Sequence, residues 1–129
     1  IMIIDTPISL GELIDKISIL QIKSQKIKGV KKQKLINNEL KLLGATLVKV
    51  LGEEKKIKKY LNKLCIVNSI LWEVEDKIRE CERQKKFDKG FIDLARKIYI
   101  TNDKRAKIKL EVNQKFGSQI VEVKSYKKY

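Results

Sequence analysis

The chain has 129 residues, a length typical of one domain that buries its own hydrophobic core. Hydrophobic residues make up 43% of it, too many for an intrinsically disordered protein. The formal net charge is +14, and a field of this sign attracts polyanions such as nucleic acid. Only four of the cations are arginines, however, and aromatic residues are 6%, whereas nucleic-acid interfaces favour arginine and stacked aromatics. A nucleic-acid partner and a lysine-rich composition from AT-rich coding are therefore both open.

Cysteine usage and hydropathy indicate the compartment. Cys65 and Cys81 fall within one predicted helix and would lie about 24 Å apart along it, too far for a disulfide. The sequence shows no signal peptide and no apolar run of membrane-spanning length. We therefore predict a cytoplasmic protein with reduced thiols and no membrane contact.

Capping residues predict the first two helices. Residues 1–5 form a short apolar run typical of a strand. Ser9, with Glu12 three residues later, forms a capping box that predicts a helix to about Lys28. Apolar residues at alternating three- and four-residue spacing then predict a second helix over residues 31–51, ended by a glycine.

The third helix carries the clearest pattern in the chain. An unbroken heptad seam consists of Ile57, Tyr60, Leu64, Val67, Leu71, Val74, Ile78 and Cys81. Asp88 can cap a fourth helix that runs to Phe116. Because a seam this long calls for a partner helix, we predict a homo-oligomer or binding to a partner helix.

These elements predict one all-α domain over residues 1–129. Its architecture is an antiparallel bundle of three to four helices around a long helical hairpin. Residues 120–126 contain alternating β-branched positions. We therefore add a short β-pair between the N-terminal and C-terminal segments to the prediction.

A polar layer interrupts the apolar face of the fourth helix. Its core stripe should include positions 102, 105 and 109, which are Asn102, Arg105 and Lys109. If the hairpin turns near residues 86–87, these positions face a stripe of the third helix. That stripe consists of Asn68, Trp72 and Asp76, spaced four residues apart.

Three interpretations of this layer are open. Asp76 can pair with Arg105 in a satisfied network that fixes helix register, or the stripe can face solvent. Alternatively, the layer is a pocket in which Arg105, Lys109 and Lys16 receive an anion and Trp72 forms a wall. The candidate ligand-binding residues are Lys16, Asn68, Trp72, Asp76, Asn102, Arg105 and Lys109.

Signatures of enzymes and metal sites are weak. The chain contains no histidine, the commonest general base and metal ligand, and neither cysteine has zinc-ligand spacing. Glu73 and Asp76 match half of a magnesium-binding pattern, but a second Glu-x-x-Glu is missing, so we predict no metal and no cofactor. The leading hypothesis is a non-enzymatic binding or assembly module. The alternatives are a receptor or enzyme for a phosphorylated or other anionic small molecule, and a nucleic-acid accessory protein.

Several blocks of sequence resemble an uncharacterised family of small helical bacterial and phage proteins, a domain of unknown function. The matching blocks are Gly11-Glu12-Leu13-Ile14-Asp15-Lys16-Ile17, Val67-Asn68, Leu71-Trp72, Glu75-Asp76-Lys77-Ile78-Arg79, Leu94-Ala95-Arg96 with Tyr99, Thr101-Asn102-Asp103, Arg105-Ala106, Gly117-Ser118, Val121-Glu122 and Lys124-Ser125-Tyr126. The resemblance implies a helical domain that stands alone or is attached to larger proteins, and it implies no activity. The blocks include six of the seven candidate ligand-binding residues, all except Lys109.

Overall fold

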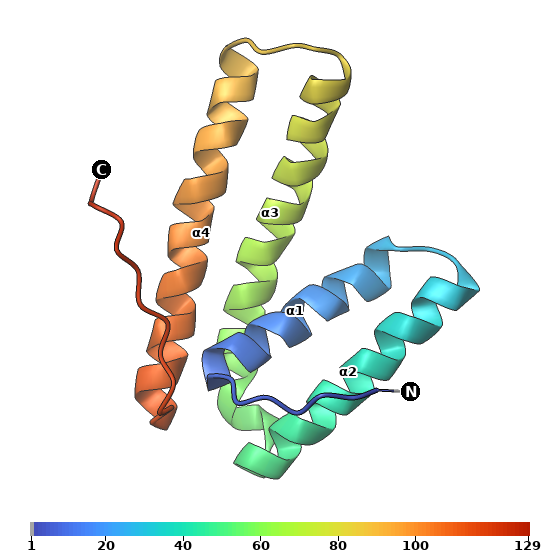
Figure 1. Ribbon diagram of the computed structural model, residues 1–129, viewed down its shortest axis with the longest axis vertical. Coiled ribbons are helices and arrows are strands. Elements are labelled where there is room, and N and C mark those ends of the chain that lie inside the picture. Colours follow the sequence, from blue (N-terminus) through green and yellow to red (C-terminus); the bar gives the residue numbers. More distant parts are fainter. Residues whose placement is uncertain (1) are drawn as a thin grey trace.

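The protein consists of two helical hairpins packed together, as the computed structural model of residues 2–129 shows (Figure 1). The helices are α1 (Leu10–Lys26), α2 (Val30–Leu51), α3 (Lys58–Arg83) and α4 (Lys89–Phe116), with a 3-10 turn (Glu54–Ile57) before α3. The predicted all-α bundle around a long hairpin is confirmed. Within residues 2–129, no helix is both long and apolar enough to cross a membrane.

Local side-chain contacts fix the helix ends. The Ser9 hydroxyl accepts a hydrogen bond from the Glu12 backbone N–H at 3.1 Å, and Asp88 caps α4 in the same way. Helix α1 ends at Lys26, two residues before the predicted end. The Gln33 side-chain amide donates to the backbone carbonyls of Ser24 and Ile27, which would otherwise lack partners at this helix end.

The hydrophobic core lies where α1 crosses the lower half of the α3–α4 hairpin. Its fully buried side chains are Ile14 from α1, Leu47 from α2, Ile57 and Leu64 from the start of the seam, and Val112 from α4. Both α1 and α4 pack on α3, so helices of the same chain cover the first half of the heptad seam. The seam therefore does not by itself require a second copy of the chain, and self-association stays a prediction.

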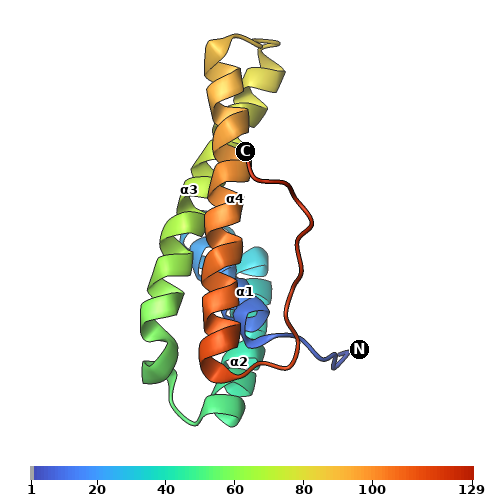
Figure 2. The same cartoon turned by 90° about the vertical axis from the view of Figure 1, so that its left-hand side faces the viewer.

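The upper half of the α3–α4 hairpin projects beyond α1 and α2 (Figure 2). Seam residues Ile78 and Cys81 in this half are only partly buried, and so are Phe91 and Ile98 on α4. The projecting half is therefore a two-helix structure without a third covering layer.

The predicted β-pair is absent from residues 2–129, where no strand forms. Residues 2–8 are extended and exposed, and residue 1, which the prediction included, lies outside the described residues. Residues 118–129, here called the C-terminal segment, run back along α4 and away from the N-terminus (Figure 1). Polar contacts to α4 hold this segment, which explains why its alternating residues do not pair with residues 2–5.

Candidate functional site

Helices α1 and α4 approach each other unusually closely at Gly11. The Gly11 backbone N–H donates to the Asn113 side-chain oxygen at 2.7 Å. A Cβ at this position would lie only 2.6 Å from the Lys109 carbonyl oxygen, so only glycine fits without a shift. This contact brings the next residues on the same face of α1, Asp15 and Ser18, against α4 and α3.

Asp15 is the centre of a buried polar network that joins three helices. Its side chain is 0% exposed. One carboxylate oxygen accepts hydrogen bonds from Arg105 Nε and Asn68 Nδ2, both at 2.9 Å, and the other accepts from a second Arg105 nitrogen. Asn68 also donates to the Ser18 hydroxyl at 2.8 Å. The hydrogen bond to Asp15 raises the pKa of Arg105, so the guanidinium stays charged.

The structure corrects the predicted partner of Arg105. The prediction paired it with Asp76, whereas Asp15 of α1 binds it, and Asp76 is exposed. The register of the α3–α4 hairpin could not predict which residue of α1 would reach Arg105. A signal was present, because Gly11, Asp15 and Ser18 lie at four- and three-residue spacing and form a small or polar stripe on a buried helix.

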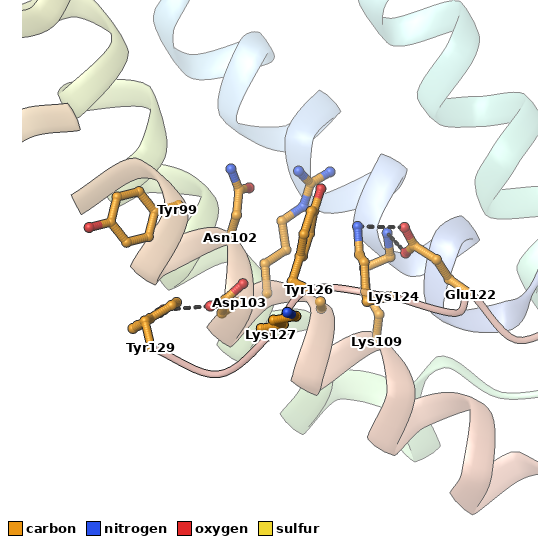
Figure 3. Close-up of a pocket in the computed structure, with 11 residues that line it drawn as sticks. Tyr99, Asn102, Asp103, Lys109, Glu122, Lys124, Tyr126, Lys127 and Tyr129 are labelled. Atoms are coloured by element: carbon orange, nitrogen blue, oxygen red, sulfur yellow. Dashed lines mark hydrogen bonds and ion pairs between the residues drawn. The ribbon is translucent and has the colours of Figure 1, made fainter. Parts of the chain in front are cut away.

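A second set of charges surrounds Lys109, which is 9% exposed. Its ammonium group lies 2.7 Å from a Glu12 carboxylate oxygen and 3.3 Å from one of Glu122. Glu122 also pairs with Lys124 at 2.8 Å, and both lysines point toward it in Figure 3. The Lys124 hydrogen bond lowers the pKa of Glu122, helped by the Lys109 charge and opposed by partial burial. Glu122 therefore attaches the C-terminal segment to α4 as a carboxylate.

Beneath this segment lies a cavity of about 540 Å³, here called the C-terminal pocket. It is lined by Tyr99, Asn102, Asp103, Arg105, Ala106, Lys109, Glu122, Lys124, Tyr126, Lys127 and Tyr129 (Figure 3). At its far end the Tyr129 hydroxyl donates a hydrogen bond to the Asp103 carboxylate, and the rings of Tyr99 and Tyr129 pack edge to face. The pocket thus combines several cations with aromatic walls. Sequence periodicity gave no signal for it, because an extended, exposed segment forms one side.

A second cavity of about 460 Å³, here called the Trp72 pocket, lies between α1, α3 and α4. It is lined by Ile19, Ile22, Asn68, Leu71, Trp72, Glu75, Asp76, Arg79, Asn102 and Arg105. Five of the seven predicted site residues thus meet at one cavity: Asn68, Trp72, Asp76, Asn102 and Arg105. Asn102 and Arg105 line both pockets, so the two cavities adjoin along α4.

The other two predicted site residues lie elsewhere. Lys109 lines the C-terminal pocket only, while Lys16 is exposed and lines neither cavity. The prediction placed Lys16 toward the core, but its neighbour Asp15 occupies that position. Lys16 is therefore outside the site as the structure shows it.

Comparison with protein families identifies one match. The model described as "Family of unknown function (DUF6165)" matches residues 4–129. The chain belongs to this family. Comparisons with curated proteins and with solved structures gave no match. In this DUF6165 protein, the two pockets are the features that could bind a ligand.

Acid is expected to release the C-terminal segment from α4 of this DUF6165 protein. Because the folded-state pKa of Glu122 lies below its ordinary value of 4.5, its carboxylate stabilises docking above that pH. Docking should weaken as the pH falls through the folded-state pKa, when Lys109 and Lys124 lose their shared partner. The NMR amide chemical shifts of residues 118–129, followed between about pH 6 and pH 3, should move toward random-coil values as the segment detaches.

Glu122→Gln is the control for this transition. The groups facing Glu122 are the cations Lys109, Lys124 and Arg105, with Glu12 on the far side of Lys109. The variant should lose the acid-dependent step and show chemical shifts close to random-coil values at every pH. The same pH profile in both proteins would contradict the assignment to Glu122.

Proposed function

We propose that this protein is a non-enzymatic binding module for a phosphorylated small molecule, held in the C-terminal pocket. The observation that carries the proposal is the charge of the cavity lining. Four cations, Arg105, Lys109, Lys124 and Lys127, face two acids, Asp103 and Glu122. A concave site with a positive surplus attracts phosphate and holds it through charge-assisted hydrogen bonds.

The four cations differ in what already binds them. Arg105 and Lys109 are paired with carboxylates of α1, Asp15 and Glu12, which offset much of their charge. Lys124 and Lys127 are exposed; Lys124 pairs with Glu122, whereas Lys127 makes no ion pair with the side chains that the structure describes. We therefore assign the direct phosphate contacts to Lys124 and Lys127.

A binding role without chemistry fits the acids of the pocket. A general base is most effective when its pKa lies near the working pH. The pKa of Glu122 is lowered by Lys124, away from neutrality, and Asp103 already accepts the Tyr129 hydroxyl. Glu122 is therefore poorly suited to exchange a proton with a ligand at neutral pH.

Titration calorimetry with phosphorylated probes tests the proposal. The probes are inorganic phosphate, AMP and a set of hexose phosphates. The double variant Lys124→Ala/Lys127→Ala is expected to weaken binding about tenfold or more, because each charge-assisted hydrogen bond contributes about 1.5–3 kcal/mol. Both side chains are exposed or partly exposed, so the variant should fold normally.

The matched control is Lys107→Ala/Lys115→Ala, which removes the same charge from exposed positions of α4 that line neither pocket. It should leave affinity for the probes nearly unchanged. Equal losses in both double variants, with affinity falling steeply as salt rises, would indicate general polyanion binding instead. A panel without any binding would reject the proposal.

A further inference from the structure

We infer that the Trp72 pocket is the second half of the same site and receives the sugar of a phosphorylated sugar; this inference rests on the proposed function. The two cavities share Asn102 and Arg105 as lining residues. A ligand longer than phosphate that lies across these two side chains would reach from the C-terminal pocket toward Trp72.

The charges of the Trp72 pocket select the uncharged part of such a ligand. Its lining holds two acids, Glu75 and Asp76, and two arginines, Arg79 and Arg105. Glu75 pairs with Arg79 at 3.4 Å, and Arg105 is held by Asp15. Both arginines of this lining are therefore already paired, whereas the C-terminal pocket also contains Lys127, which makes no ion pair with the described side chains.

Two hydrogen-bond acceptors in the polar lining lack partners. Asn68 uses its amide N–H groups on Asp15 and Ser18, and its carbonyl oxygen accepts no hydrogen bond from residues 2–129. The Asp76 carboxylate makes no hydrogen bond or ion pair with the side chains that the structure describes. Ionised carboxylates and amide carbonyls only accept, so a ligand group that binds these two acceptors must be a donor. Hydroxyl groups are the donors that sugars carry in greatest number.

Trp72 supplies the matching apolar wall. Its indole ring is half-buried and lines the cavity with Leu71, Ile19 and Ile22. The C–H face of a pyranose ring is apolar while its rim carries hydroxyls, a combination that fits an aromatic wall beside acceptors. A nucleobase also has an apolar face, but it offers few donors. The volume of about 460 Å³ lies within the range for small-ligand sites.

The test compares probes that differ only in the sugar. The probes are the 1- and 6-phosphates of glucose, galactose and mannose, inorganic phosphate and AMP, measured by titration calorimetry. At least one hexose phosphate is expected to bind about tenfold tighter than inorganic phosphate, the gain from a few hydroxyl hydrogen bonds. Asp76→Asn should reduce that advantage and leave the affinity for inorganic phosphate unchanged. Asp76 is exposed, so this substitution should not disturb folding.

Two further variants complete the experiment. Glu73→Gln removes an exposed carboxylate of α3 that lies outside the pocket, and it should bind every probe like the wild type. Trp72→Leu, with its fold verified by circular dichroism, should also lose the sugar-dependent gain.

Each outcome separates this inference from the proposed function. Equal affinities for inorganic phosphate and all hexose phosphates would overturn the sugar site, while sensitivity to Lys124→Ala/Lys127→Ala would preserve the phosphate site. AMP binding tighter than every hexose phosphate, with loss in Trp72→Leu, would overturn the sugar in favour of a base. Failure of all probes would overturn both proposals.

Discussion

Arg105→Ala is expected to lower the free energy of unfolding by about 3–5 kcal/mol, because it leaves a buried carboxylate without its ionic partner. Asp15 is 0% exposed, and Arg105 supplies two of its hydrogen bonds. The remaining donor, Asn68, is neutral and cannot balance the charge. Urea denaturation followed by far-UV circular dichroism measures the effect.

The double variant Asp15→Ala/Arg105→Ala should lose less stability than the two single variants added together, because neither charge is then left unpaired. Arg96→Ala removes an exposed arginine from the same helix and should change stability by no more than about 0.5 kcal/mol. Similar losses in Arg105→Ala and Arg96→Ala would show that the network contributes little to stability. Because Arg105→Ala is expected to damage the fold, it is a poor probe of ligand binding, and Lys124 and Lys127 are better ones.

Gly11→Ala is expected to destabilise the protein by about 1–3 kcal/mol through overpacking. The new Cβ would lie 2.6 Å from the Lys109 carbonyl oxygen and 3.0 Å from the Asn113 side-chain oxygen. The first of these is a backbone atom, so the crowding cannot be relieved by rotating a side chain. Helix α1 would have to move away from α4, which would also stretch the contacts of Asp15.

Gly44→Ala is the matched control for this substitution. Gly44 lies inside α2, and a Cβ there would meet no atom within 4 Å. Alanine has the higher helix propensity, so Gly44→Ala should stabilise the protein by up to about 1 kcal/mol. The two substitutions should therefore have opposite signs in thermal and urea denaturation. A stabilising Gly11→Ala would contradict the close approach of α1 and α4.

Local signals made much of the fold predictable. Caps such as Ser9 and Asp88 act through neighbouring residues, so helix starts could be located without knowing the tertiary structure. An antiparallel hairpin with a short turn has one register, which was enough to bring Asn68 and Trp72 near Arg105. These predictions needed only local patterns and the register of one hairpin.

Features that depend on a third helix or on an extended segment could not be derived in this way. Asp15 contacts a residue far along the chain, and the crossing of α1 over the hairpin decides that it, rather than Lys16, turns inward. The C-terminal segment has no helical periodicity, and its placement depends on single contacts such as Glu122 to Lys109. The C-terminal pocket therefore appears only in three dimensions.

Because half of the α3–α4 hairpin projects without a third covering layer, the two ends of the molecule should differ in local stability. Near Arg105, three helices share buried apolar contacts and a carboxylate-centred network, whereas near Phe87 and Ile92 the side chains are about half exposed. Local opening costs least where few apolar contacts must be broken. Thermal fluctuations should therefore separate the two helices near their turn first, and this fraying should stop before it reaches Asn102 and Arg105, which line both cavities.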